Sequence, residues 1–117
     1  MLNKQNRLLK DSDFKYLFSK GFYQSGPEMT LRYIETKQKE SRFGIVISSK
    51  VSKKAVLRNK VKRRLRDIIK KKHDKIKMGY DIVVILKKRG IDANFARLDL
   101  ALETLLKKAR LYDTEKK

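Results

Sequence analysis

The segment covering residues 50–72 concentrates side chains that could bind phosphate groups. It contains twelve Lys and Arg residues and one acid, Asp67, so it holds more than half of the chain's formal net charge of +19. Four of its arginines fall within nine residues, namely Arg58, Arg63, Arg64 and Arg66. Arginine binds phosphate oxygens through two parallel N–H donors or stacks on bases, whereas lysine acts as a point charge. This composition predicts recognition of a polyanion.

The same segment has the periodicity of a helix over about residues 55–72. Its apolar residues recur at helical spacing and predict a stripe that packs on a sheet; they are Leu57, Val61, Leu65, Ile68 and Ile69. The remaining surface carries like charges at intervals of four residues, namely Arg58, Lys62, Arg66 and Lys70. Because like charges at this spacing repel one another, the pattern favours a helix face that an external polyanion neutralises.

Two further helices are expected, one towards each end of the chain. Ser12-Asp13 predicts the start of a short helix that ends at Gly21. Asp92 or Asn94 predicts the start of the last helix. The apolar positions of the first helix are Phe14, Leu17 and Phe18, and those of the last are Phe95, Leu98, Leu102, Leu105, Leu106 and Ala109.

Segments rich in β-branched and aromatic residues predict strands over residues 29–36, 43–49 and 80–86. The first two are expected to pair as a hairpin through a turn at residues 38–41. Residues 80–86 are apolar on both faces, which is typical of a central strand. The pattern as a whole predicts a sandwich in which helices cover one sheet.

The composition excludes several classes of protein. The chain has no cysteine, so disulfides, thiolate nucleophiles and cysteine-bound zinc are absent. The longest apolar runs, Phe43–Ile47 and Ile82–Leu86, have five residues and are too short to cross a membrane. The first ten residues lack the apolar core of a secretory signal. We therefore expect one cytoplasmic domain over residues 1–117, with flexible arms at residues 1–10 and 112–117.

The residue types do not point to catalysis or metal binding by the protein. His73 is the only imidazole and follows three lysines, whose charge opposes its protonation. The acids show no spacing that forces a metal-binding cluster; they include Asp11, Asp13, Asp81, Asp92 and Asp99. We expect no catalytic residue and no metal ligand in this chain.

Several segments resemble the bacterial ribonuclease P protein family. Residues 55–66, which include Arg58-Asn59-Lys60-Val61-Lys62-Arg63-Arg64-Leu65-Arg66, are similar to the family's signature helix. Residues 43–50 resemble the strand before that helix, residues 13–21 the first helix, and residues 80–85 the last strand. The sequence departs from the family at Lys60, where Arg is common, and in the segment Lys50-Val51-Ser52-Lys53-Lys54.

The resemblance implies a fold and an activity. The fold is α+β, a two-layer sandwich in the order α-β-β-β-α-β-α, with about four strands in a mixed sheet and a left-handed β-α-β crossover. Such proteins bind a catalytic RNA, and the complex removes the 5′ leader from precursor tRNA. The RNA carries out the cleavage with Mg²⁺, and the protein itself binds no cofactor.

The resemblance also implies binding residues. Those expected to contact the catalytic RNA are Lys50, Lys53, Arg58, Asn59, Lys60, Lys62, Arg63 and Arg66. Those expected to contact the leader of precursor tRNA are Phe14, Phe18 and Tyr33. Single-stranded RNA is held by stacking of its bases on aromatic rings beside a cationic wall, although Phe14 and Phe18 could equally fill a core. The protein alone is expected to be monomeric, with the two RNAs as its partners and no membrane contact.

Other functions remain open from the residues alone. A ribosomal protein or general RNA chaperone would have a similar charge. A DNA-binding architectural protein is less favoured because the basic helix has no dimerisation seam, and a free-standing nuclease because no catalytic constellation is present. Binding to an anionic membrane is less favoured because the core needs the apolar stripe of the basic helix.

Overall fold

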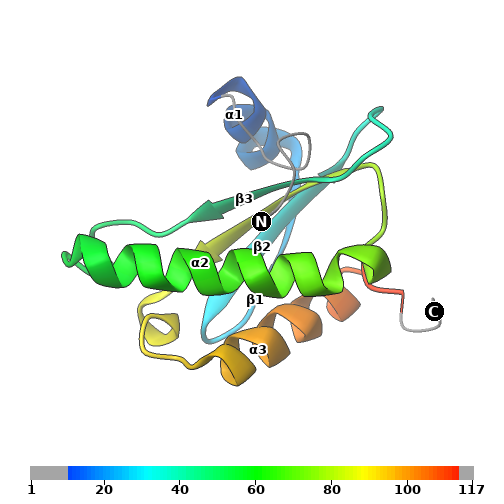
Figure 1. Ribbon diagram of the computed structural model, residues 1–117. Coiled ribbons are helices and arrows are strands. Elements are labelled where there is room, and N and C mark those ends of the chain that lie inside the picture. The colour runs from blue at the N-terminus through cyan, green and yellow to red at the C-terminus, as the bar shows by residue number, and fades with distance from the viewer. Residues whose placement is uncertain (1–10, 114–117) are drawn as a thin grey trace.

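A computed structural model describes residues 11–113, so the arm expected at residues 1–10 lies outside the described part of the chain. The chain forms three α-helices and a four-stranded sheet in the predicted order (Figure 1). The elements are α1 (Asp11–Lys20), β1 (Phe22–Ser25), β2 (Met29–Glu35), β3 (Arg42–Val46), α2 (Ala55–Lys72), β4 (Tyr80–Leu86) and α3 (Phe95–Lys108). Short 3₁₀ turns follow α2 and β4. None of the helices in residues 11–113 is long and apolar enough to cross a bilayer.

The sheet has the strand order β1-β2-β4-β3, in which only β3 and β4 are parallel. The prediction that residues 29–36 and 43–49 form a hairpin is therefore wrong. β2 instead forms its hairpin with β1, where the Gly26 N–H donates to the Met29 carbonyl at 2.9 Å. β4 then inserts between β2 and β3. Its apolar faces are both covered there, since Ile82 and Val84 lie in the main core and Val83 packs with Leu17 of α1. The predicted central position of residues 80–86 is confirmed.

The connection from β3 through α2 to β4 is left-handed. Figure 1 views the sheet from the side of α2; β3 and the yellow-green β4 both point to the left, and β4 lies below β3. When the view is turned so that both strands point upward, α2 lies in front of the sheet and β4 lies to the left of β3. In a right-handed connection seen from the helix side, β4 would lie to the right of β3. The handedness that the family resemblance implied is thus confirmed.

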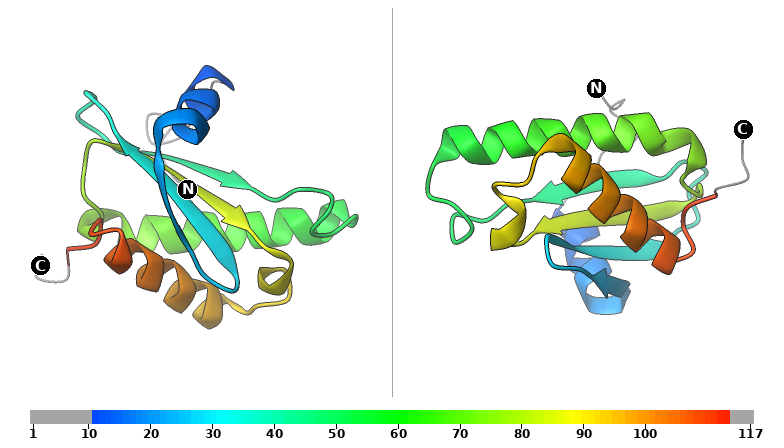
Figure 2. Two further views of the ribbon diagram at one scale, coloured as in Figure 1. Left: turned by 180° about the vertical axis from the view of Figure 1, so that it is seen from behind. Right: turned by 90° about the horizontal axis from the view of Figure 1, so that it is seen from below.

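The main core lies between the sheet and the two longer helices, which sit side by side on one face (Figure 2). The stripe predicted for α2 is confirmed, since Val61, Leu65, Ile68 and Ile69 are buried. The stripe predicted for α3 is confirmed at its leucines, but Phe95 is 39% exposed and lies outside the core.

Asn94, one of the two predicted caps, begins α3. Its side-chain oxygen accepts a hydrogen bond from the Arg97 N–H at 2.9 Å. Asp92, the other candidate, lies two residues further upstream and is exposed. At the other end of the chain, Tyr112 forms a β-bridge with Ile76, and the Asp113 N–H donates to the Lys75 carbonyl at 2.7 Å.

The opposite face of the sheet is covered at one end by α1 (Figure 2, left). Leu17 is fully buried against Ile34 and Val83, and this small cluster attaches α1 to the sheet. Gly21 ends α1 where a side chain has no room, because a Cβ there would lie 2.5 Å from the Leu17 carbonyl oxygen and 2.9 Å from that of Tyr33. This close approach fixes the angle at which α1 leaves the sheet.

Candidate nucleic-acid interface

One side of α2 carries a row of basic side chains, here called the basic row, that consists of Arg58, Lys62, Arg66 and Lys70. Another side of the helix contacts α3 and the loop before it, where Lys71 Nζ lies 3.1 Å from Asp99 of α3 and Arg64 donates to the carbonyl of the loop residue Ala93 at 3.3 Å. The basic row lies more than about 100° round the helix from these contacts. It therefore points away from α3 and toward the side of β3, the edge strand of the sheet.

Within residues 11–113, α2 forms ion pairs only in its last turn. Lys71 and Lys72 pair there with acids of α3. The basic row forms no ion pair in the described part of the chain. Arg58 is held by the backbone instead, since its Nη1 donates to the Ser52 carbonyl at 2.6 Å. Charges that are placed on the surface without partners are available to an external anion.

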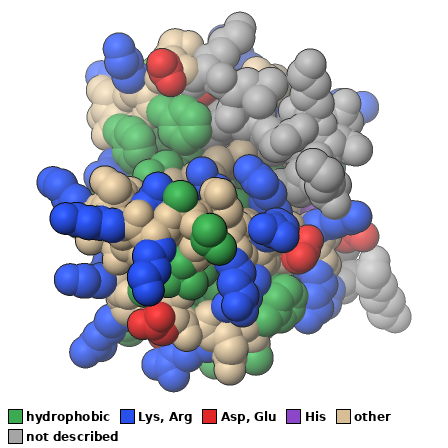
Figure 3. All heavy atoms as spheres, turned by 60° about the vertical axis from the view of Figure 1, so that its left-hand side comes forward, with side chains coloured by type: hydrophobic (Ala, Val, Ile, Leu, Met, Phe, Trp, Pro, Cys, Tyr) green, Lys and Arg blue, Asp and Glu red, His purple; other side chains and the backbone are tan. Residues whose placement is uncertain are grey.

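The start of α2 adds to this positive potential. The first turn contains no acid, and the residue before the helix is Lys54, which gives no side-chain cap. A helix N-terminus already carries partial positive charge, so cations there oppose the helix dipole. Figure 3 brings this end of the molecule forward, and lysine and arginine side chains spread over the view with few acids among them.

The structure brings the predicted RNA-contacting residues together. Six lie between Arg58 and Arg66 on α2, and Lys50 and Lys53 lie on the loop that enters it. Most of these side chains are exposed, and Arg58, Lys62 and Arg66 are half-buried along the flank of the helix. Together they form one continuous surface made of adjacent segments of the chain.

The far end of α2 contrasts with this surface because two of its lysines, Lys71 and Lys72, are neutralised by acids of α3. Lys72 is only 5% exposed and contacts Asp99 and Glu103, with 2.8 Å to the Glu103 carboxylate. Burial alone would lower the pKa of Lys72, but hydrogen bonds to the two carboxylates raise it above its usual value. The hydrogen bond from Lys72, together with one from Lys107, lowers the pKa of Glu103 to about 2. These ion pairs fasten α2 to α3.

Two of the predicted leader-binding residues, Phe14 and Phe18, lie together on α1. Their ring centroids are 6.5 Å apart, within the range of an aromatic pair. Phe14 is half-buried and packs on the small cluster under α1, whereas Phe18 is 41% exposed. Phe14 therefore contributes to packing, and Phe18 presents its ring to solvent.

Tyr33, the third predicted leader-binding residue, is not brought together with them. It lies opposite Ile82 on β4 and packs against the main core, on the face that α2 and α3 cover. Its ring pairs with that of Phe22, at 6.1 Å. Successive residues of a strand point to opposite faces, so Arg32, its neighbour, takes the place on the α1 face.

Arg32 and Tyr23 are residues of this surface that the sequence did not predict. The guanidinium carbon of Arg32 lies 5.1 Å from the Phe18 ring centroid and 5.7 Å from that of Tyr23. We call Phe14, Phe18, Tyr23 and Arg32 the aromatic surface. The sequence did contain a signal for Arg32. The apolar residues Met29, Leu31 and Tyr33 alternate along this strand, so Arg32 is expected on the opposite face of the sheet.

Acids near α1 are used in structural contacts. Arg42 donates to both oxygens of Asp81, at 2.9 and 2.7 Å, and also pairs with Asp13 at 3.2 Å. These contacts, first among them the hydrogen bond to Asp81, raise the pKa of Arg42. Within residues 11–113 no group of three or more His, Asp or Glu side chains is placed to hold a metal ion.

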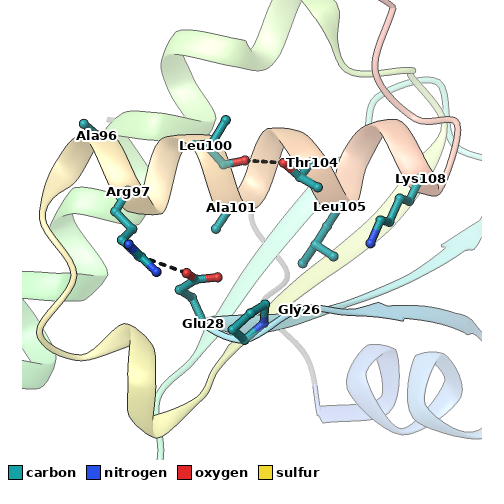
Figure 4. Close-up of a pocket in the computed structure, with 10 residues that line it drawn as sticks. Gly26, Glu28, Ala96, Arg97, Leu100, Ala101, Thr104, Leu105 and Lys108 are labelled. Carbon is teal, nitrogen blue, oxygen red and sulfur yellow. Dashed lines mark hydrogen bonds and ion pairs between the residues drawn. The ribbon is translucent and has the colours of Figure 1, made fainter.

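A separate hollow of about 510 Å³ lies between α3 and the turn that joins β1 to β2 (Figure 4). Leu100, Ala101 and Leu105 line it from the helix, and Arg97 closes one end by pairing with Glu28 at 3.1 Å. It contains none of the predicted RNA-binding residues.

Fold and site together define a small, strongly basic α+β protein whose second helix presents a row of positive charges with no acid partner in the described part of the chain. Comparison with known proteins agrees. Residues 2–110 match the family described as Ribonuclease P. The ribonuclease P protein component of Synechocystis is 37% identical and covers 96% of this chain and 91% of its own, and that of Clostridium botulinum is 33% identical with 94% and 99% covered.

Solved structures show the same fold. The ribonuclease P protein of Staphylococcus aureus has a TM-score of 0.85 at 30% identity, covering 92% of this chain and 98% of its own. That of Thermotoga maritima has a TM-score of 0.80 at 32% identity, with 87% and 96% covered. The chain belongs to the bacterial ribonuclease P protein family, and its role is that of the protein subunit in tRNA processing.

Proposed function

We propose that this subunit binds the catalytic RNA through α2 and the loop before it, and the 5′ leader of precursor tRNA through the aromatic surface. The observation that carries the proposal is the division of charge along α2. Lys71 and Lys72 at the end of the helix pair with acids, whereas the basic row, which ends at Lys70, has no acid partner within the described residues. Unpaired charges that repel one another at intervals of four residues are relieved when phosphates bind.

The residues proposed to contact the catalytic RNA are the eight predicted from the sequence. Arg58 is positioned before RNA arrives, because the Ser52 carbonyl holds one of its terminal nitrogens. Arg63 is exposed, and its planar group can bind a phosphate through two N–H donors. Asn59 lies on the same exposed surface and can donate to or accept from a sugar, phosphate or base.

The leader is proposed to lie across the α1 side of the sheet. Single-stranded RNA binds where aromatic rings stack on bases beside positive charge. Phe18 and Tyr23 are 41% and 63% exposed on this side, and Arg32 lies beside both rings. The catalytic RNA and the leader thus bind different parts of one small domain.

Cleavage itself is proposed to be carried out by the RNA with Mg²⁺. The acids that α1 and the sheet bring together, Asp13 and Asp81, are engaged by Arg42, which supports a structural role for them. The protein neutralises the repulsion between two polyanions and so lowers the Mg²⁺ concentration that cleavage requires. With a formal net charge of +19 the protein repels copies of itself, and we propose that it acts as a monomer in the cytoplasm.

A reconstitution with the catalytic RNA tests this function. Precursor tRNA is incubated at low Mg²⁺ with the protein alone, the RNA alone or both. We expect removal of the leader at the mature 5′ end only when both are present. Cleavage by the protein alone would instead support a protein nuclease. Annealing of unrelated RNAs without cleavage of the precursor would support the alternative of a general RNA chaperone.

A further inference from the structure

Arg32 lies at the centre of the aromatic surface and is held there by three contacts. Its guanidinium group is within cation–π distance of the Phe18 and Tyr23 rings, at 5.1 and 5.7 Å. Its Nη1 also donates to the backbone carbonyl of Phe18 at 3.2 Å. An arginine that binds a ligand normally loses rotamer freedom in doing so. In Arg32 much of this ordering has occurred before a ligand arrives.

The contacts leave one edge of the Arg32 guanidinium group unused. Nε–H and Nη2–H form no hydrogen bond within residues 11–113, and Arg32 forms no ion pair there. These two N–H groups lie on the same edge of the planar group and point in parallel. The side chain is therefore arranged to donate two parallel hydrogen bonds to one ligand.

A second arginine on the same face shows that this arrangement is not a general feature of the surface. Arg42 lies on β3 and uses the corresponding edge, its Nε and Nη2, on the Asp81 carboxylate. Asp13 takes up its other donors. Arg32 is thus the arginine of the described α1 face whose paired donors remain available.

We propose that Arg32 selects guanine in the leader, with its Nε and Nη2 donating to guanine O6 and N7. The inference rests on the proposed function, in which the leader crosses this surface. Bases stack on the rings of Phe18 and Tyr23, so a group beside those rings meets the edge of a base rather than a phosphate. Guanine O6 and N7 are the acceptors that the arginine fork binds most often.

The experiment uses the reconstituted complex of protein and catalytic RNA with precursor tRNAs that carry a uridine-only leader. Guanine, adenine or cytosine is introduced at each leader position in turn, and the dissociation constant is measured. Cytosine is the most demanding comparison, because its N3 and O2 also form a pair of adjacent acceptors. We expect guanine at one position to tighten binding about tenfold over the other three bases.

Two changes test the assignment of that preference to Arg32. Replacing the favoured guanine by 7-deazaguanine removes N7 and should abolish most of the preference. Arg32→Lys keeps the positive charge and loses the paired donors, so it should reduce the preference from about tenfold to less than about twofold. Mature tRNA without a leader should bind the Arg32→Lys complex and the unaltered complex equally well.

The outcomes separate the two proposals. Equal binding of all four bases by the unaltered protein, or a guanine preference that persists in Arg32→Lys, overturns selection by Arg32. A uniform loss for every leader would assign Arg32 to a phosphate and also overturn it. If the protein does not distinguish precursor from mature tRNA at all, the proposed leader binding itself fails. Should Arg32→Lys lower the unfolding temperature, the comparison of guanine with 7-deazaguanine in the unaltered protein still decides.

Discussion

At the scale of single residues, pairing with acids divides the arginines of the α1 face into structural and available groups. Arg42 is only 17% exposed and contacts two carboxylates, and its pKa is raised by them. Arg32 contacts rings and a carbonyl, and its Nε and Nη2 have no hydrogen-bond acceptor among residues 11–113. Residue type alone does not separate the two roles, since each is an arginine on the same face of the sheet.

Phe18→Ala should weaken binding of precursor tRNA by the complex about tenfold and leave binding of mature tRNA unchanged. The reason is that stacking of one base on an aromatic ring contributes roughly 1–3 kcal/mol, and mature tRNA has no leader to stack. The measurement is the dissociation constant of each tRNA. Phe95→Ala is the matched control, because that ring is similarly exposed, at 39% against 41%, but lies on α3. Equal losses for both tRNAs, or a loss of folding, would assign Phe18 to the core.

Sequence reasoning located the rings of α1 but missed their neighbours. Phe14 and Phe18 follow from a helical period within one short segment. Tyr33 was assigned to the same surface, yet strand alternation places it on the covered face and Arg32 on the α1 face. Tyr23 belongs to a strand whose register with β2 is set by tertiary pairing. Contacts within one helix could be predicted, and contacts across strands could not.

At the scale of elements, the two ends of α2 differ in what their charged side chains contact. Its last turn is joined to α3 by the ion pairs of Lys71 and Lys72, and the segment from Arg58 to Arg66 presents charge to the outside. The outward charge was visible in the sequence, because the run of like charges and the apolar stripe lie in one continuous segment. The ion pairs were not predicted, because they depend on how α2 and α3 pack together.

Arg58→Ala/Arg63→Ala should weaken binding of the catalytic RNA and reduce its salt dependence. Each phosphate contact that is lost lowers the slope of log K against log salt by roughly one unit. Binding is measured over a series of potassium chloride concentrations. Lys39→Ala/Lys108→Ala removes the same charge from exposed positions away from the start of α2 and should change the slope less. An equal slope in both double variants would argue against α2 as the RNA-binding element.

Glu103→Gln should destabilise the protein by about 1 kcal/mol at pH 7, because it removes a carboxylate that pairs with Lys72 and Lys107 and is partly screened by solvent. The pKa of Glu103 lies at about 2 when folded, below its usual 4.5. Its contribution is therefore complete above pH 4.5 and is lost as the pH falls toward 2.

Urea unfolding at a series of pH values checks this contribution. The difference between Glu103→Gln and the unaltered protein should shrink steadily below pH 4.5. Glu35→Gln, at an exposed acid of β2, serves as a control that should have little effect at any pH. A difference that is independent of pH would mean that the ion pair contributes nothing.

The order of the elements could be predicted from local patterns, but the pairing of the strands could not. Each helix could be predicted from its apolar spacing, and the first and last helices also from the residues expected to cap them. The hairpin expected between residues 29–36 and 43–49 failed because β4, which arrives much later in the chain, separates these strands. The left-handed crossover likewise runs against the general rule, and only the likeness to a known family indicated it.

At the scale of the whole molecule, the net charge of +19 predicts that bound anions stabilise the fold, because they relieve repulsion among the positive charges. Low concentrations of pyrophosphate should raise the unfolding temperature by about 5 °C, or roughly 1 kcal/mol, relative to chloride at equal ionic strength. Arg58→Ala/Arg63→Ala/Arg66→Ala should lose more than half of this rise. Differential scanning fluorimetry measures both. An equal rise in the triple variant would show that the anion binds elsewhere.

The attachment of α1 to the far side of the sheet has a consequence for the assembled enzyme. Leu17 and the contacts of Arg42 leave little freedom between α1 and the strands, while α2 is packed on the opposite side. The single layer of strands therefore holds α1 and α2 at a fixed distance from each other. If the catalytic RNA binds α2 and the leader binds the aromatic surface as proposed, the distance between the two RNAs is fixed by the thickness of the sheet.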